Sequence, residues 1–317
     1  MIRAAPALAL LLALAHPALA ESRDDTPAAA LAALQHADAR LLAIGWRLAT
    51  GNARYCENAR PAVGLLLQDM AGYAEPEAMR KAAGIDGPVA VQAVAPGSPA
   101  GAAGLRANDE VVAIDRVETA ALPADEASDW RRLARLHAMI EASLADDGEV
   151  RVRLRDGREI ALTGVPVCLS RFELIGGDDA AADGARVVIG REFAGLAYPD
   201  DELAAAVAHE LAHNLLRHRV WLDEHGRKWR NVRATEREAD RMMPWLLANA
   251  GYDPGAALRF MRRWGPDHGG GLFRKRTHEG WDERAQTIEA EIALVQAARG
   301  PDGSADWARN FVREIGE

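Results

Sequence analysis

The sequence predicts an α+β fold in which a mainly helical domain with a small sheet follows a β-sandwich or barrel module with two helices. Three observations support this: helical periodicity near both ends of the chain, short strands bounded by Gly and Pro between them, and two cysteines that flank those strands. A chain of 317 residues is long enough to bury two hydrophobic cores. The net charge of −9, without a block of Lys or Arg, argues against nucleic acid or an anionic membrane as a partner.

The first 20 residues have the layout of a cleavable export signal. Arg3 supplies a basic start, residues 7–15 form an apolar run, and the small residues Ala18 and Ala20 stand where a signal peptidase requires them. The apolar run is shorter than the roughly 20 residues that cross a bilayer, so a membrane anchor is the weaker alternative. We therefore expect an exported, periplasmic or secreted protein whose mature chain has no integral membrane segment.

Residues 21–58 are expected to form a helical segment that packs on the C-terminal domain. Helical periodicity extends over residues 28–49, and Thr50-Gly51-Asn52 is expected to end the helix. Cys56 and Cys168 are the only two cysteines, and a pair of cysteines in an oxidising compartment suggests one disulfide. Two free thiols are the alternative.

Residues 59–166 alternate short strands, turns and helices. Residues 61–69 (PAVGLLLQD) are expected to form a loop entering a strand, and residues 128–147 an amphipathic helix. Residues 149–165 are expected to form a hairpin that turns at Asp156-Gly157, a pair favoured in two-residue turns. Within residues 88–117, GSPAGAAGL and NDEVVAI resemble the most recognisable segment of PDZ domains of the bacterial protease type.

That resemblance implies a groove in which an extended peptide pairs with a strand edge while backbone N–H groups bind its terminal carboxylate. Val63, Gly64 and Leu65 would belong to the carboxylate loop, and Leu66 to the pairing strand. The wall of the groove would come from the apolar face of the helix, which carries Leu133, Leu136, His137 and Ile140. The alternative is a PDZ-like module that packs on its neighbour and binds no peptide.

The segment AHELAHNLLRH at residues 208–218 contains three histidines and a glutamate. His209 and His213 are one turn apart on a helix expected from Leu203 to about His218, so both imidazoles can bind one metal ion. Glu210 points about 100° around the helix axis and can reach the water bound to the ion without ligating the ion itself. These are the roles of the residues in the H-E-x-x-H motif of zinc proteases.

A tetrahedral catalytic zinc needs a third protein ligand and one open position. Glu236 and Asp240 share one face of a second expected helix, so we expect Glu236 to bind the metal and Asp240 to accept the N–H of a ligand histidine. Glu238 is expected to face roughly the opposite way, and His218 to lie at a helix end, turned away from the ligands. The alternative for these carboxylates is a solvated charged helix face.

The segments DDELAAAVAHELAHNLLRH, EREAD and NAGYDPGAALRFMRRW resemble the M48 family of zinc metallopeptidases over residues 170–295. In that family a Glu in an ExxxD helix completes the HExxH site. The resemblance implies a metallopeptidase domain at residues 167–317, of the soluble secreted type that carries a PDZ domain. Two positions depart from the family: Asp179 stands where an Asn is frequent, and His278 is followed by Glu rather than Pro. His278 is a candidate for stabilising the developing oxyanion, with a surface histidine as the alternative.

These residues together predict a zinc endopeptidase with one Zn²⁺ per chain, which cleaves polypeptides and in particular unfolded or misfolded envelope proteins as a form of quality control. The metal would polarise the scissile carbonyl, and Glu210 would take a proton from the metal-bound water and return it to the leaving amine. The PDZ-like module would bind substrate tails, including C-terminal ones. The alternatives are a non-proteolytic, zinc-containing peptide-binding or chaperone-like protein, and a metal-dependent hydrolase of small amides.

The tryptophans of the C-terminal domain are expected in its core, with the wall of a substrate cleft as the alternative. They are Trp221, Trp229, Trp245, Trp264 and Trp281.

Overall fold

The computed structural model describes residues 26–124, 127–268 and 280–316, and combines helices with four small sheets in these ranges. The mixture of helices and small sheets confirms the α+β prediction in its coarse form. The expected export signal at residues 1–20 and the candidate His278 lie outside the described residues. Among the described helices, none is long and apolar enough to cross a membrane.

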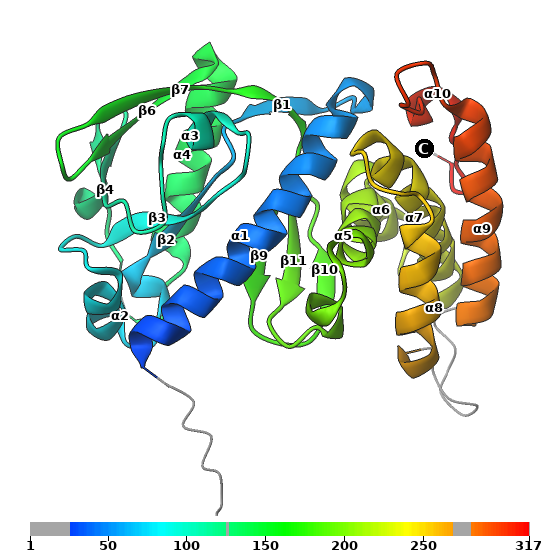
Figure 1. Ribbon diagram of the computed structural model, residues 1–317, viewed down its shortest axis with the longest axis horizontal. Coiled ribbons are helices and arrows are strands. Elements are labelled where there is room, and N and C mark those ends of the chain that lie inside the picture. The colour runs from blue at the N-terminus through cyan, green and yellow to red at the C-terminus, as the bar shows by residue number, and fades with distance from the viewer. Residues whose placement is uncertain (1–25, 125–126, 269–279, 317) are drawn as a thin grey trace, which may run out of the picture.

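A long N-terminal helix, α1 (Pro27–Asn52), lies between the two halves of the molecule (Figure 1). Thr26 caps the helix by accepting the N–H of Ala29. The helix ends at Asn52, within the Thr50-Gly51-Asn52 segment that was expected to end it. Gly51 does not break the helix but lets it approach another backbone, since a Cβ there would lie 2.5 Å from the carbonyl oxygen of Asn249.

A strand-rich module follows α1, on the left of Figure 1. Its antiparallel sheets are β2–β3 and β5–β4–β6–β7, and its core includes Leu67, Ile114 and Leu136. The elements are β1 (Ala59–Ala62), β2 (Leu65–Asp69), α2 (Pro76–Ala83), β3 (Val89–Val94), α3 (Pro99–Ala102), β4 (Val111–Ile114), β5 (Val117–Glu118), α4 (Arg131–Asp147), β6 (Glu149–Leu154), β7 (Glu159–Thr163) and β8 (Val165–Cys168).

The hairpin between β6 and β7 is present, but its predicted two-residue turn is wrong. The N–H of Leu154 donates to the carbonyl of Arg158, so residues 155–157 form a three-residue loop. Gly157 occupies the left-handed region with φ 89°, as the last residue of such loops requires. Asp156-Gly157 therefore marked the position of the turn correctly and its length incorrectly.

The C-terminal domain is mainly helical and holds one three-stranded sheet of order β10–β11–β9. In this sheet β11 runs parallel to β9 and antiparallel to β10, which leaves β10 as an edge strand. The elements are β9 (Arg171–Ile175), β10 (Ala180–Ala182), β11 (Arg186–Gly190), α5 (Asp200–Leu215), α6 (His218–His225), α7 (Trp229–Asn249), α8 (Ala256–His268), α9 (Trp281–Ala298) and α10 (Trp307–Asn310).

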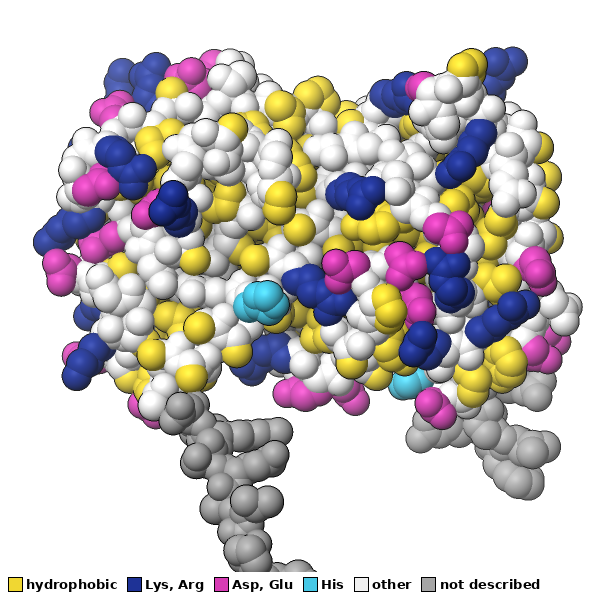
Figure 2. All heavy atoms as spheres, in the orientation of Figure 1, with side chains coloured by type: hydrophobic (Ala, Val, Ile, Leu, Met, Phe, Trp, Pro, Cys, Tyr) yellow, Lys and Arg dark blue, Asp and Glu magenta, His cyan; other side chains and the backbone are white. Residues whose placement is uncertain are grey.

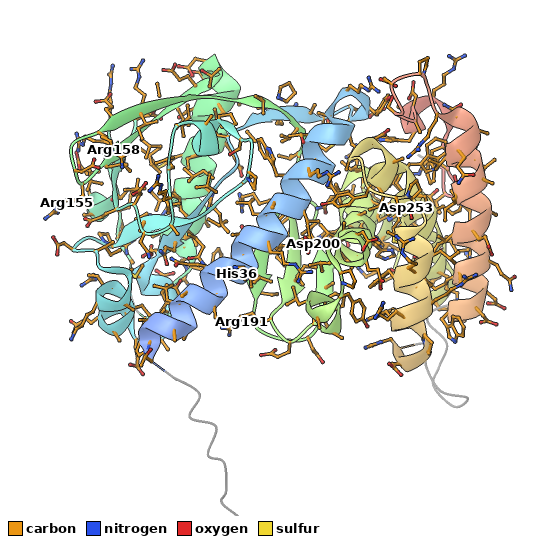
Figure 3. The ribbon with its side chains drawn as sticks, viewed as in Figure 1. His36, Arg155, Arg158, Arg191, Asp200 and Asp253 are labelled. Carbon is orange, nitrogen blue, oxygen red and sulfur yellow. A yellow bond between two sulfur atoms is a disulfide. The ribbon has the colours of Figure 1, made fainter. Side chains whose placement is uncertain are left out.

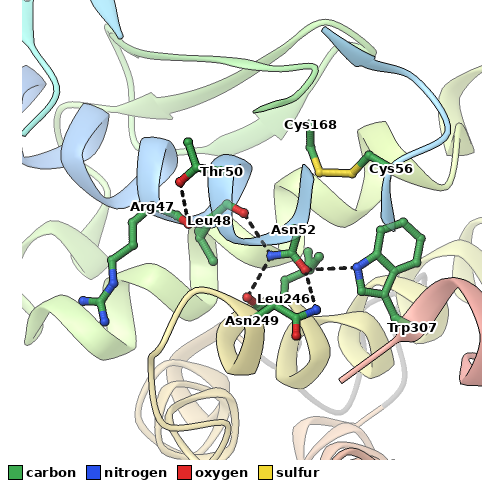
Figure 4. Close-up of a disulfide and its surroundings, with 9 residues drawn as sticks. All are labelled: Arg47, Leu48, Thr50, Asn52, Cys56, Cys168, Leu246, Asn249 and Trp307. Atoms are coloured by element: carbon green, nitrogen blue, oxygen red, sulfur yellow. Dashed lines mark hydrogen bonds between the residues drawn. A yellow bond between two sulfur atoms is a disulfide. The ribbon is translucent and has the colours of Figure 1, made fainter. Parts of the chain in front are cut away.

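The two ends of the strand-rich module meet beside a disulfide. β1 pairs with β8 in antiparallel register, with Ala59 opposite Cys168. The predicted bond between Cys56 and Cys168 is present (Figure 4). Beneath it, the buried amide of Asn52 donates to the carbonyls of Leu48 and Leu246, which ties the end of α1 to α7.

Helix α1 packs on both halves, whereas the sequence predicted contact with the C-terminal domain alone. The buried Asp38 accepts hydrogen bonds from Gln92 of β3 at 2.7 Å and from the N–H of Leu174 of β9 at 3.1 Å. Arg40 donates to Asp200 at the start of α5, which lies beside α1 (Figure 3). Figure 2 shows Lys and Arg side chains interspersed with Asp and Glu across this face of the molecule.

Candidate metal centre

Helix α5 presents the H-E-x-x-H residues to a cleft while its other faces are buried. Three acidic residues, Asp200, Asp201 and Glu202, occupy its first turn, where the helix dipole favours negative charge. The helix ends at Leu215, and Arg217 turns the chain with φ 57° before α6 begins at His218. The expectation that α5 continues to His218 is therefore wrong.

His209 and His213 of α5 converge with Glu236 of α7. The two Nε2 atoms are 3.2 Å apart, and the oxygens of Glu236 lie 3.4 Å from Nε2 of His209 and 3.6 Å from that of His213. Ligand atoms about 2.0–2.1 Å from a tetrahedral zinc ion are separated by about 3.3–3.4 Å. The three residues therefore fit a zinc ion both in spacing and in the chemistry of their donor atoms.

The electrostatics of this cluster favour a cation between the three side chains. Burial alone would lower the pKa of His209, but Asp240 and Glu236 outweigh it and hold that pKa above its ordinary value. Glu236 responds in the opposite sense, because His209 and His213 outweigh its burial and lower its pKa. Burial lowers the pKa of the third residue, His213, to about 3, so its imidazole is neutral and can offer a lone pair to a metal ion.

Glu210 lines the same cleft, which has a volume of about 1140 Å³. Burial raises the pKa of Glu210 to about 7, and the negative charge of Glu236 adds to the shift. A carboxylate with a pKa near neutrality can both accept and return a proton at physiological pH.

Asp240 lies behind His209, on the side away from the cluster. Its Oδ1 is 3.1 Å from Nδ1 of His209, although the N–H of the imidazole is not aligned with that oxygen. Arg284 of α9 donates two hydrogen bonds to Asp240, at 2.6 and 2.7 Å. The buried pair of Asp240 and Arg284 thus supports one of the candidate ligands.

His218 and Glu238 lie behind the other candidate ligand, and the sequence did not reveal this. Nδ1 of His218 is 2.9 Å from Nδ1 of His213, and its Nε2 is 3.1 Å from Glu238. A five-residue spacing turns His218 away from His213 only if the helix continues. The left-handed turn at Arg217 brings His218 back, so the prediction that it lies apart is wrong.

The cleft is bordered by the edge strand β10 and by aromatic residues of α8 and α9. Asp179 and the residues of β10 lie on one side, and Trp264 and Trp281 on another. Trp264 stacks between Phe260 and His268. The tryptophans therefore differ in their roles: Trp245 is buried in the core, and Trp264 and Trp281 line the cleft. Trp229 is exposed and Trp221 is half-buried outside the cleft, so the prediction is wrong for these two.

A comparison with known protein families identifies part of the strand-rich module. Residues 91–138 match the PDZ domain. The match extends from β3 into α4, and it suggests that this module binds peptides. No curated protein matches the chain. The metallopeptidase resemblance concerns residues 170–295, outside the matched segment, and stays a prediction.

The four residues predicted to bind a peptide lie before the matched segment, and they differ in burial. Val63 and Leu66 are buried, Gly64 adopts a left-handed conformation with φ 66°, and Leu65 is half-buried. The side chain of Leu66 belongs to the large core beside α1 rather than to a groove. Peptide binding at these four residues stays a prediction.

The helix of the PDZ domain that would wall the groove lies against the C-terminal domain. His137 of α4 is buried, and Arg171 and Glu173 of β9 act on it electrostatically. Arg171 also donates to Glu141 of α4 at 2.5 Å. Leu136 and Ile140 of the same helix are packed in the core of the module rather than facing an open groove.

Proposed function

We propose that this protein is a zinc-dependent endopeptidase whose PDZ domain binds segments of its polypeptide substrates. The observation that carries the proposal is the convergence of His209, His213 and Glu236 beside Glu210 at spacings that fit a tetrahedral ion. Three protein ligands leave one coordination position open, as catalytic zinc sites require.

The roles of the side chains follow from their positions. A zinc ion held by His209, His213 and Glu236 would polarise the scissile carbonyl and lower the pKa of a water molecule at the site. Glu210 is the candidate general base, which accepts the proton of the attacking water and delivers it to the leaving amine. Asp240, itself held by Arg284, restrains the ring of His209.

The border of the cleft favours a polypeptide over a small amide as substrate. An extended peptide can pair with the free edge of β10, because an edge strand leaves backbone donors and acceptors unpaired. Trp264 and Trp281 add apolar surface for substrate side chains. Unfolded proteins supply extended segments of this kind, which is consistent with the proposed action on misfolded proteins of the cell envelope.

A non-proteolytic protein with a structural zinc ion is the competing proposal, and it needs a fourth protein ligand. In the described part of the chain, the group able to hold an ion consists of three residues. His218 is the nearest further histidine, but both of its ring nitrogens face other partners, His213 and Glu238. The geometry of these residues favours the catalytic alternative.

The deciding experiment compares zinc-loaded mature protein with its Glu210→Gln variant on an unfolded protein substrate. We expect cleavage by the parent, a loss of about 100-fold or more in the variant, and unchanged zinc content. Glu224→Gln, at an exposed position of α6, is the matched control and should cleave like the parent. Absence of cleavage in every sample would favour the binding protein, and equal cleavage by parent and Glu210→Gln would exclude Glu210 as the base.

A further inference from the structure

The two candidate ligand histidines are supported by different arrangements. Behind His209 stands a carboxylate in direct reach, Asp240. Behind His213 stands a second histidine, His218, and only then a carboxylate, Glu238. His218 and Glu238 are 1% and 0% exposed, so the surrounding structure fixes the positions of both side chains.

The other hydrogen bonds of Glu238 show which atom donates in its contact with His218. Glu238 accepts from the side chain of Arg313 at 2.8 Å, and from the backbone N–H groups of Glu314 and Ile315. A carboxylate so surrounded is an acceptor, so Nε2 of His218 carries the hydrogen that points at it.

The tautomer of His213 follows from that of His218. A neutral His218 that donates through Nε2 has a free lone pair on Nδ1, which accepts the N–H of Nδ1 of His213. His213 then has its own lone pair on Nε2. That atom faces His209 and Glu236, where the candidate metal ligands converge.

We infer that His218 and Glu238 are positioning residues that fix the ring orientation and tautomer of His213, and that residues 313–315 hold Glu238 in place. The inference rests on the proposed metal site. It extends that site to a segment about a hundred residues further along the chain, through contacts that the H-E-x-x-H pattern does not contain.

Arg313 couples this segment to α5 as well. Its Nη2 donates to the carbonyl of Leu216 at 3.1 Å, directly after the helix that carries His213. One side chain thus spans Glu238 and the end of α5. Removing the hydrogen bonds of Arg313 should therefore disturb the position of His213 without changing any of the candidate metal ligands.

Zinc affinity, measured by competition with a chromogenic chelator, tests the inference together with the visible spectrum of the Co²⁺-substituted protein. His218→Phe keeps a buried ring but removes both hydrogen bonds, and we expect zinc binding to weaken by about 10–100-fold with an altered Co²⁺ spectrum. His218→Asn keeps an acceptor for His213 and should recover much of the affinity. Arg313→Ala should show a smaller, several-fold loss.

Arg309→Ala, at an exposed position of α10, is the matched control for Arg313→Ala, because Arg309 lies outside the hydrogen bonds of His218 and Glu238. It should bind zinc like the parent. Unchanged zinc affinity and Co²⁺ spectrum in His218→Phe, with only lower stability of the metal-free protein, would overturn the inference. If His218→Phe does not fold, Arg313→Ala decides, and parent-like zinc binding there overturns it.

Zinc binding also separates this inference from the proposed activity. If the protein binds zinc in the manner described but cleaves no substrate, the positioning role is supported and the proposed peptidase activity is excluded. A parent protein that binds no zinc overturns both.

Discussion

At the scale of single residues, His137 links the contact between the domains to stability. It lies on α4, is buried, and its Nε2 has no hydrogen-bond partner among the described residues. Burial and, to a lesser extent, Arg171 lower the pKa of His137 to about 4, while Glu173 opposes the shift. The neutral imidazole is therefore the form that the folded protein accommodates.

This lowered pKa predicts a loss of stability in mild acid. Between pH 6.5 and about 4 the unfolded chain binds a proton at His137 that the folded chain resists, so the free energy of unfolding falls as the pH falls. The full effect is about 3 kcal/mol. Urea denaturation of the parent and of His137→Leu across this range measures it. Parallel pH profiles for the two proteins would contradict the assignment.

The residues of the candidate site differ in how far the sequence could predict them. The pairing of His209 with His213 follows from helical geometry alone, since residues four apart share a face. To predict that Glu236 lies close to them, it was necessary to see that an ExxxD segment follows the HExxH segment along the chain. His218 could not be placed in this way, because its position depends on the backbone of Arg217. Arg217 adopts the left-handed conformation, which is uncommon for arginine and was not predictable from its residue type.

At the scale of elements, the docking of α1 on β9 depends on one glycine. A Cβ at Gly45 would lie 2.1 Å from Cγ of Phe172, so no larger residue fits without movement. We expect Gly45→Ala to lower the free energy of unfolding by about 2 kcal/mol, because overpacking outweighs the gain in helix propensity. Urea denaturation measures this change.

Two further variants separate the clash at Gly45 from a general effect of the substitution. Gly72→Ala, where no atom lies within 4 Å of the added Cβ, should unfold like the parent. Combining Gly45→Ala with Phe172→Leu should recover part of the lost stability. Strictly additive losses in the double variant would show that the two side chains do not compete for the same space.

The existence of most elements was predictable, and their ends and pairings were not. Apolar periodicity located α1 and α4, and turn residues located the hairpin at Gly157. The close approach of Gly51 in α1 to the backbone of α7 is a tertiary contact, which a local pattern does not contain. Likewise, nothing local in β9 or β11 determines that these strands run parallel.

At the scale of the whole molecule, the disulfide joins the entry of the strand-rich module to its exit. It connects positions 112 residues apart. In the chain-entropy account, such a cross-link stabilises the folded state by about 4–5 kcal/mol, because it restricts the unfolded chain. The double variant Cys56→Ala/Cys168→Ala should unfold at correspondingly lower urea. A reductant should bring the parent to the level of this variant and leave the variant unchanged; an unchanged parent would contradict the account.

The sequence showed that α1 has an apolar face but not what covers it, and the answer has a consequence for cooperativity. The helix covers Leu66, Ala93 and Ala95 of the PDZ domain while it packs on Phe172 of the C-terminal sheet. Without α1, these apolar side chains of the module and of the C-terminal sheet would be exposed to water, so no flexible linker separates two independent melting units. Heating should give one calorimetric transition with matching calorimetric and van 't Hoff enthalpies. An excised PDZ domain, with these apolar side chains exposed, should aggregate rather than fold alone.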